Sequence, residues 1–160
     1  MEPIERVLKA YGPALSRVAS SYERSPAGRD ELLQDIVLAL WKAWPSFRGE
    51  CSERAFVLRI AHNRGLTHAW RRPPPHEPLD EVPAAGEAPD QLVAASEQRV
   101  QLLEAVHALP LKHREVVLLL LEDLSHAEIA QVLGISENNV AVRLTRARAA
   151  LRSAMNPGGA

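Results

Sequence analysis

Residues Ser125–Arg152 read SHAEIAQVLGISENNVAVRLTRARAALR and contain two apolar helical patterns separated by a glycine. Ser125 and Glu128 have the spacing of a capping box, which predicts a helix that begins at His126. Gly134 can adopt the positive φ that a tight turn requires. The stretch therefore predicts a helix-turn-helix, the arrangement that presents its second helix to the major groove of DNA.

The second helix of this motif, expected over Glu137–Ala154, has an apolar and a polar face. Apolar residues recur at i, i+4, i+7 and i+11 and are expected to face inward: Val140, Leu144, Ala147 and Leu151. Amide and guanidinium groups cover the remaining surface, and such groups bind base edges or phosphates. A solvated basic helix end is the alternative, because arginine also suits the helix C-terminus. We favour contact with duplex DNA through Asn138, Asn139, Arg143, Arg146 and Arg148.

The whole chain has 160 residues, of which 46% are hydrophobic, 24% charged and only 4% aromatic. This balance is that of a globular protein, and its aliphatic character favours packed helices over β-sheets. The net charge of −1 hides an uneven distribution. Residues 1–72 have 12 basic and 8 acidic side chains, residues 73–95 have 0 and 5, and residues 96–160 have 7 and 7. The sequence thus combines a basic N-terminal half with an acidic connector.

Six of the twelve prolines lie in residues 73–95, which are also poor in large apolar side chains. Proline removes a backbone donor and disfavours a helix in the residue before it. We predict an all-α chain with two small helical domains, over 1–72 and 96–160, joined by a flexible linker over 73–95. The expected helices are Pro3–Tyr22 (which Pro13 can kink or split), Asp30–Trp44, Glu53–Arg72, Leu92–Ala108, Leu111–Glu122, His126–Leu133 and Glu137–Ala154.

The expected helix Asp30–Trp44 also has two faces. Its core-facing stripe consists of Leu33, Ile36, Val37, Leu40 and Trp44. Another face combines acidic, amide and large apolar side chains: Glu31, Gln34, Asp35, Leu38 and Trp41. A leucine and a tryptophan beside acids, away from the core, indicate a surface that binds a helix of another protein. The alternative is that Trp41 packs on the first helix of its own domain.

The loop SFRGECS, residues 46–52, precedes a helix that has Ser52 as its expected N-cap. Arginines, aromatic rings and an amide alternate here, which suits single-stranded DNA because rings stack on bases and guanidinium groups bind phosphates. Core packing is the alternative for Phe56 and Trp70, and we favour it for those two. The better candidates for DNA contact are Phe47, Arg48, Arg59, His62 and Asn63.

The sequence has no signature of an enzyme or of a metal or cofactor site. Motifs of nucleotide-binding proteins and serine hydrolases are absent, the six histidines lack metal-ligand spacing, and Cys51 is the single cysteine. We expect no catalytic residues, no cofactor and no metal. The longest apolar run, Val116–Leu121, is too short to span a bilayer, and the N-terminus does not read as a secretory signal. We expect a cytoplasmic protein without membrane insertion.

Three motifs, in this order, make the chain resemble the extracytoplasmic-function sigma factors of bacterial RNA polymerase, which belong to the sigma-70 family. ELLQD at Glu31–Asp35 is similar to the family's D-L-V-Q-E signature. Phe47-Arg48-Gly49 and the LRIAHN run at Leu58–Asn63 are similar to its F-x-G and R-I-A-x-N signatures. Leu109-Pro110, Arg114-Glu115-Val116 and the RLTRAR run at Arg143–Arg148 are similar to its C-terminal signature. The resemblance covers almost the whole chain.

The resemblance implies a role for each motif and three partners: core RNA polymerase, promoter DNA and a separate anti-sigma factor. It implies that the Glu31–Trp41 face docks on the clamp coiled coil of the polymerase β′ subunit. It implies that the loop 46–52 and the next helix capture an unpaired base of the minus-ten element, with Arg59, His62 and Asn63 in support. Reading of the minus-thirty-five element is implied for Ser136, Asn138, Asn139, Arg143, Arg146 and Arg148. The acidic linker is implied to thread toward the polymerase active-site channel.

Two features differ from the family pattern. The family usually has a tryptophan after the loop, at the position of Phe56 or Val57, where only a phenylalanine is present. The run NVAV at Asn139–Val142 replaces a Thr-Val-Lys-Ser run. Two alternative functions remain: an ordinary helix-turn-helix repressor or activator, and a sigma-like mimic that titrates an anti-sigma factor. The N-terminal motifs argue against the repressor, and the retained arginines of the second helix argue against the mimic.

Overall fold

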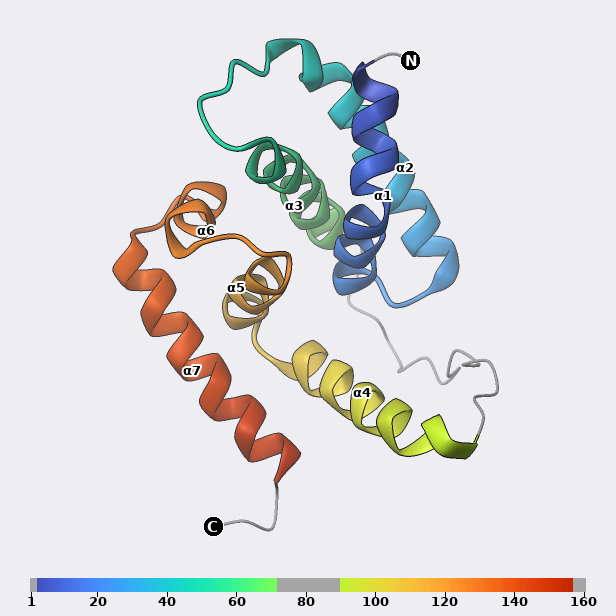
Figure 1. Ribbon diagram of the computed structural model, residues 1–160, viewed down its shortest axis with the longest axis vertical. Helices are drawn as coiled ribbons and strands as arrows, with labels where there is room; N and C mark the ends of the chain where they lie inside the picture. Colours follow the sequence, from blue (N-terminus) through green and yellow to red (C-terminus); the bar gives the residue numbers. More distant parts are fainter. Residues whose placement is uncertain (1–2, 72–89, 157–160) are drawn as a thin grey trace.

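The computed structural model describes residues 3–71 and 90–156, and all regular structure in these two ranges is helical. The first range contains α1 (Pro3–Tyr22), α2 (Pro26–Ala43), the short 3₁₀ helix η1 (Trp44–Ser46) and α3 (Glu53–Arg71). The second contains α4 (Asp90–Ala108), α5 (Leu111–Leu121), α6 (His126–Leu133) and α7 (Glu137–Met155) (Figure 1). The all-α prediction is confirmed. No helix in the described part of the chain is long and apolar enough to cross a membrane.

The helices α1, α2 and α3 pack against one another around an aliphatic core. Its fully buried side chains include Val7, Leu15, Leu32, Ile36, Leu40 and Leu58. α1 remains a single helix through Pro13, so the possible split does not occur. Burying one aliphatic side chain contributes about 1.5–3 kcal/mol, so a few of them on both sides of the proline offset its cost of about 3 kcal/mol.

The helix α2 begins four residues before the expected Asp30. Ser25 Oγ accepts a hydrogen bond from the Gly28 amide at 3.0 Å, and Pro26 occupies the first turn, where a missing N–H costs nothing. The inward stripe also differs from the predicted one, because Leu32 is fully buried and joins the core. Ile36 and Leu40 are fully buried as expected, whereas Leu33, Val37 and Trp44 are half-buried.

The helix α7 packs against α4, α5 and α6. Buried side chains of this half include Val106, Val116, Ile129, Val140 and Leu144. α6 spans the predicted residues, whereas α4 begins at Asp90, inside the range 73–95 that we predicted as a linker. No proline occurs between Pro89 and Pro110, so the backbone can form a continuous helix from Asp90 onward. The remainder of the predicted linker, 73–89, lies outside the described residues.

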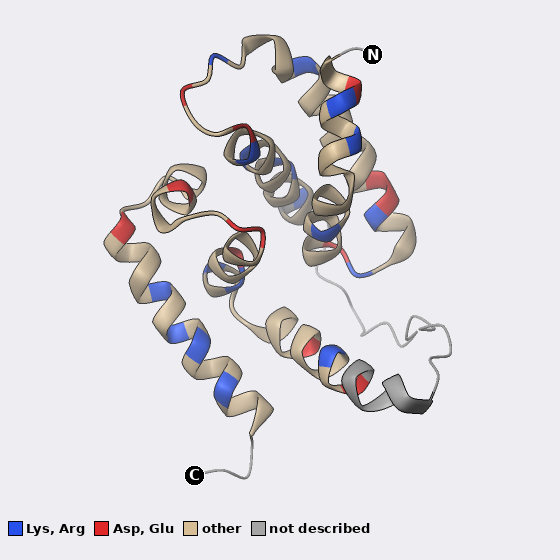
Figure 2. Ribbon diagram, viewed as in Figure 1, with Lys and Arg blue, Asp and Glu red and all other residues tan. Residues whose placement is uncertain are grey.

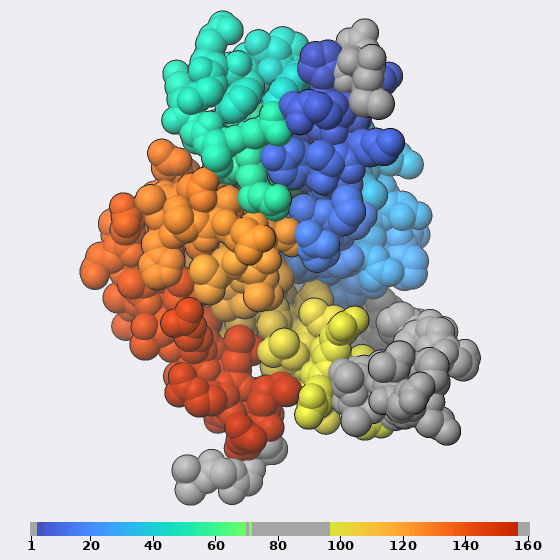
Figure 3. All heavy atoms as spheres, in the orientation of Figure 1, coloured from blue at the N-terminus to red at the C-terminus, as the bar shows by residue number. Residues whose placement is uncertain are grey.

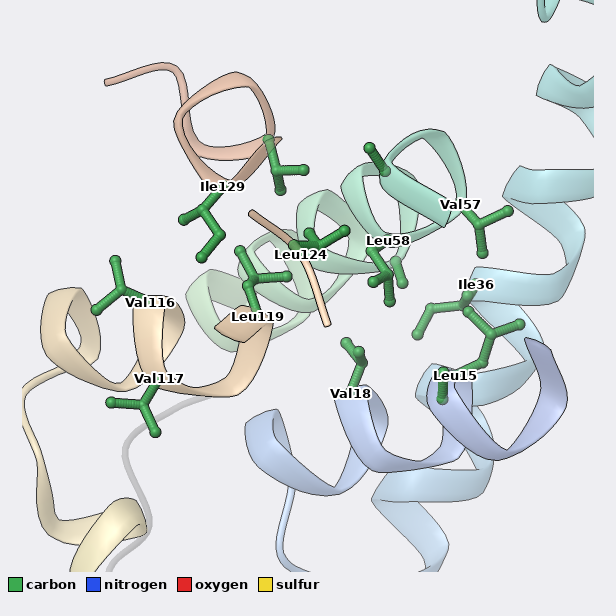
Figure 4. Packing of buried hydrophobic residues seen from close by; sticks show 14 of the residues in the cluster. Leu15, Val18, Ile36, Val57, Leu58, Val116, Val117, Leu119, Leu124 and Ile129 are labelled. Atoms are coloured by element: carbon green, nitrogen blue, oxygen red, sulfur yellow. The ribbon is translucent and has the colours of Figure 1, made fainter. Parts of the chain in front are cut away.

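The two halves of the chain pack against each other, mainly through α3 and α6 (Figure 3). Leu58 of α3 and Val18 of α1 point toward Leu119, Leu124 and Ile129 of the second half (Figure 4). All five side chains are buried and belong to one continuous cluster of apolar residues. The free chain is therefore a closed arrangement in which both halves share a core.

Candidate nucleic-acid and polymerase interfaces

The helix-turn-helix has the local geometry that its sequence predicts. Ser125 Oγ accepts a hydrogen bond from the Glu128 amide at 3.1 Å, and Glu128 Oε1 accepts one from the Ser125 amide at 2.9 Å. This reciprocal capping box begins α6, and Gly134 ends it in the left-handed region with φ at 70°. Only glycine adopts that conformation without a steric cost, so the turn fixes how α7 leaves α6.

The helix α7 has a buried apolar face and an exposed polar face. Of the predicted inward residues, Val140, Leu144 and Ala147 are buried and Leu151 is half-buried. Five of the DNA candidates are accessible: Asn138, Asn139, Arg146 and Arg148 are exposed, and Arg143 is half-buried. Ser136 is exposed and is also the N-cap, because its Oγ accepts from the Asn139 amide at 3.0 Å. Basic residues follow one another along α7, whose only acidic residue is Glu137 in the first turn (Figure 2).

The loop between η1 and α3 is fixed at one end by a cluster of aromatic rings. Phe47 stacks on Trp44 with 5.2 Å between ring centroids and lies 4.8 Å from the ring of Phe56. Gly49 turns the loop with φ at 76°. Phe56 is buried, so the core role that we favoured for it is confirmed. Phe47, a DNA candidate, is half-buried in this cluster and anchors the loop.

The DNA candidates of α3 separate into exposed and buried residues. Arg59 and Asn63 are exposed one helical turn apart on α3, and Arg48 of the preceding loop is also exposed. Arg59 also lies over the ring of Phe56, with 6.0 Å from its guanidinium carbon to the ring centroid. An exposed arginine and an exposed amide suit a single strand of DNA, because its phosphates need a cation and its base edges form hydrogen bonds.

His62 does not belong to this exposed set, because it is buried between the two halves of the chain. Its Nδ1 is hydrogen-bonded to the hydroxyl of Tyr22, and its Nε2 lies 3.4 Å from Glu115 Oε1 on α5. Burial lowers the pKa of His62 to about 4 and raises the pKa of Glu115. A neutral imidazole with its hydrogen on Nε2 accepts from Tyr22 and faces the Glu115 carboxyl group, which satisfies both contacts.

The predicted partner surface on α2 is accessible. Trp41 is 57% exposed and Leu38 is 50% exposed, so Trp41 does not pack on α1. Glu31 and Gln34 are exposed on the same helix, and Asp35 lies 3.7 Å from Arg64 of α3. The helix α2 thus has one buried face and one accessible face, on which two large apolar side chains lie beside acidic groups.

Sequence reasoning missed the polar contacts that join the two halves. Arg17 of α1 binds the buried carboxylate of Glu122, and Ser52 binds Glu128. The first two residues are 105 positions apart, and no local pattern connects them. Among the described residues, no group of histidines, cysteines and acids has the arrangement of a metal site.

Comparison with known proteins finds a family model for each half of the chain. The family model Sigma-70 region 2 matches residues 7–72, which hold α2 and α3. The model Sigma-70, region 4 matches residues 99–151, which hold the helix-turn-helix. The two matches together take up most of the chain, and they occur in the order of the motifs. The chain belongs to the sigma-70 family and is a sigma factor of the extracytoplasmic-function type.

Relatives in several bacteria support the same conclusion. The RNA polymerase sigma factor CnrH of Cupriavidus metallidurans is 29% identical over 94% of this chain and 85% of its own length. A probable RNA polymerase sigma factor, RfaY of Xanthomonas campestris, is 28% identical over 92% of this chain, which spans only 39% of that relative. A solved structure of CnrH in complex with the cytosolic domain of CnrY covers 98% of this chain and 89% of CnrH, at 25% identity and a TM-score of 0.71.

The fold is also that of RpoE from Bartonella quintana, solved in complex with the anti-sigma factor NepR. That likeness covers 99% of this chain and all of the other, with a TM-score of 0.79 at 20% identity. Proteins of this class are DNA-binding factors of transcription initiation.

Proposed function

We propose that this sigma factor directs core RNA polymerase to promoters through three surfaces on two domains, over residues 1–72 and 96–160. One surface binds the polymerase, one binds the opened minus-ten element, and one reads the minus-thirty-five element as duplex. The observation that carries the proposal is the presence, in one chain, of an exposed apolar and acidic face on α2 and an exposed basic face on a helix-turn-helix. An ordinary repressor needs only the second of these.

The α2 surface is proposed to bind the clamp coiled coil of the β′ subunit. Trp41 and Leu38 would supply the buried apolar contacts, and Glu31, Gln34 and Asp35 would surround them with polar ones. Interfaces of this kind depend on a few large side chains at their centre. The exposure of Trp41 and Leu38 in the free chain supports this role, because both are available without rearrangement.

The loop 46–52 and the start of α3 are proposed to hold an unpaired base of the minus-ten element. Arg48, Arg59 and Asn63 are the accessible groups that can bind its phosphates and base edges. Phe47 packs the loop against Trp44, so it would act mainly by fixing the shape of the loop and less by touching the DNA. The ring of His62 is buried, so His62 would act indirectly, by fixing the position of α3.

The helix α7 is proposed to lie in the major groove of the minus-thirty-five element. Asn138, Asn139, Arg146 and Arg148 are exposed, and Arg143 is half-buried beside them. Asparagine pairs well with adenine and arginine with guanine, whereas arginines along the helix flank also suit phosphates. Ser136 would serve mainly as the N-cap, although its exposed hydroxyl lies at the same end of the helix.

The proposed cellular setting follows from these partners. Polymerase and promoter DNA place the factor in the cytoplasm, and RNA synthesis itself is carried out by the polymerase, so we propose no enzymatic activity for this chain. We also propose an anti-sigma factor as a regulator, because RpoE of Bartonella quintana, which has the same fold, was solved with one. The residues 73–95 are proposed to run toward the polymerase active-site channel.

The test is transcription in vitro with core RNA polymerase on a fragment library from the host genome, with and without the chain. We expect discrete start sites that depend on the chain, and loss of most of them with Asn63→Ala or Arg146→Ala. Absence of new start sites together with absence of binding to core polymerase would contradict the proposal. Sequence-specific duplex binding by the isolated chain, without the polymerase, would then favour the repressor.

A further inference from the structure

The outer face of α7 has a centre that helix geometry defines. α7 packs mainly against α4, α5 and α6, and Figure 1 shows it at the edge of the molecule with those helices on one side. Its buried side chains are Val140, Leu144 and Ala147. Successive residues of an α-helix are about 100° apart around its axis, so these three side chains give the direction of the core. The residues half a turn away from them face outward.

Val142 lies near the centre of this outer face. Around the helix axis it is about 160° from both Val140 and Leu144. Asn138 precedes it by four residues and Arg146 follows it by four, so the three side chains share one face. Asn138 and Arg146 are exposed, and Val142 is half-buried. The outer face of α7 thus has an apolar side chain between an amide and a guanidinium group.

A valine at residue 142 contributes little to the fold of the free chain. Its direction is away from the buried side chains of α7, and a β-branched residue is a weaker helix former than alanine. Val142 also belongs to the run 139–142, in which this chain differs from the family pattern, so a role shared by the whole family does not account for it. Its branched side chain gains further contacts only when a partner covers the outer face of α7.

The other basic residues of the predicted DNA set lie on the flanks of α7. Arg143 and Arg148 are on opposite sides of the outer face, each nearer to the core than Val142 is. A helix in the major groove has phosphates beside its flanks and base edges beneath its centre. The two flanking guanidinium groups therefore suit phosphates, whereas the side chain of Val142 meets a base edge. The 5-methyl group of thymine is the one methyl group that the four bases present in that groove.

We propose that Val142 is a specificity-determining residue, which selects a thymine in the minus-thirty-five element by apolar contact with the 5-methyl group of that base. Adenine, guanine and cytosine present hydrogen-bonding groups that valine cannot satisfy and no methyl group that it can bury. The inference rests on the proposed function in one respect, the position of α7 in the major groove of duplex DNA. It does not depend on which partner brings α7 to the DNA.

The test selects sequences from two random duplex libraries, by binding to the full chain alone and to the full chain with core polymerase. One library contains thymidine, and the other contains deoxyuridine in its place, which pairs with adenine in the same way and lacks only the methyl group. We expect the wild-type chain to enrich thymine at one position of the selected element. Its enrichment should be about fourfold lower in the deoxyuridine library, the effect of one buried methyl group.

Three variants assign this difference to residue 142. Val142→Ser removes both methyl groups, so it should enrich the same position equally from the two libraries. Val142→Thr keeps the branched shape and one methyl group, so it should retain part of the difference. Ala154→Ser, at an exposed position near the end of α7, is the matched control and should behave as the wild-type chain does. The two libraries are compared within each variant, so a general loss of affinity cannot imitate the result. Circular dichroism checks that every variant is helical.

The outcomes separate this inference from the proposed function. A difference between the libraries that persists in Val142→Ser would overturn the role of Val142, and so would a wild-type selection in which no thymine depends on its methyl group. Failure of the chain to select any sequence, alone and with the polymerase, would overturn it as well, because α7 would then read no bases. Loss of the methyl effect in Val142→Ser, in a chain that supports no polymerase-dependent start sites, would support the role of Val142 and contradict the proposed function.

Discussion

Gly65 of α3 lies so close to the ring of Tyr22 of α1 that a Cβ at residue 65 would be 2.4 Å from Tyr22 Cδ2. The ring is held from its other end, because the Tyr22 hydroxyl is hydrogen-bonded to the buried His62. Tyr22 therefore has little freedom to move aside. The close approach of α1 and α3 that carries the proposed minus-ten surface depends on the absence of a side chain at residue 65.

We predict that Gly65→Ala destabilises the chain by about 1–3 kcal/mol, because the added methyl group forces the Tyr22 ring or the helices apart. Urea unfolding followed by circular dichroism measures this change. Gly12→Ala is the matched control, since a Cβ at residue 12 of α1 meets nothing within 4 Å. The control should gain up to about 1 kcal/mol from helix propensity. Equal stability of the two variants would contradict the packing described here.

We predict that Trp41→Ala weakens binding to core polymerase by about tenfold or more while it changes stability by less than about 0.5 kcal/mol. The reason is that Trp41 is more than half exposed in the free chain, so its apolar surface gains contacts only in the complex. Fluorescence anisotropy of labelled chain with core polymerase gives the affinity. Lys42→Ala, at an exposed neighbour on α2, is the control. A loss of stability as large as the loss of affinity would assign Trp41 to the core instead.

We predict that Ser136→Ala lowers the stability of the C-terminal half by about 1 kcal/mol, because the Asn139 amide loses its acceptor. Ser136→Asp should retain the cap and therefore the stability. Comparing the promoter affinities of the two variants separates capping from DNA contact. If Ser136→Asp restores stability and loses DNA binding, the new carboxylate lies near phosphates. Unchanged stability in Ser136→Ala would show that the cap is dispensable.

We predict that the chain loses stability as the pH falls from about 6.5 to about 4. His62 and His107 have an ordinary pKa of 6.5, and burial lowers each to about 4 in the folded chain. The unfolded chain thus binds these protons first, so the contribution of both groups is complete above pH 6.5 and is lost as the pH falls through 4. Glu115, which faces His62, has a raised pKa, so its protonation stabilises the folded chain as the pH falls. We expect the two histidines together to outweigh this one carboxyl group.

Urea unfolding of the wild-type chain and of His62→Gln at a series of pH values tests this dependence. The glutamine can occupy the site without titrating, so the slope of stability against pH between 6.5 and 4 should be smaller in the variant. His113→Gln, at a half-buried position outside this contact, serves as the control and should keep the wild-type slope. Identical slopes in all three chains would mean that protonation of His62 does not limit stability.

The features that sequence patterns predicted correctly are those fixed within a few residues. The capping box at Ser125, the turn at Gly134 and the inward residues of α7 all follow from local spacing. The start of α2 at Pro26 has a local signal as well, a serine followed by a proline. We predicted a later start, at Asp30, because the apolar pattern begins near that residue.

The features that sequence patterns did not predict depend on contacts between distant residues. His62 has the position of a DNA-supporting residue in its motif, yet the packing of α5 against α3 buries it. Arg17 and Glu122 look like ordinary charges in the sequence, and only the tertiary structure brings them together. The candidate surfaces could be predicted from sequence patterns, whereas the burial of His62 by the second half could not.

The two carboxylate oxygens of Glu128 have different partners, which limits the substitutions that residue 128 can tolerate. One oxygen of its carboxylate caps α6 and the other accepts from Ser52, so the same side chain serves the fold of the DNA-reading motif and the closed state. A substitution at residue 128 therefore weakens both the helix-turn-helix and the contact between the two halves. Neither Ser52 nor Arg17 caps a helix of that motif. Homologues should therefore vary more freely at positions 17 and 52 than at position 128, where an acid or an amide is needed for the cap.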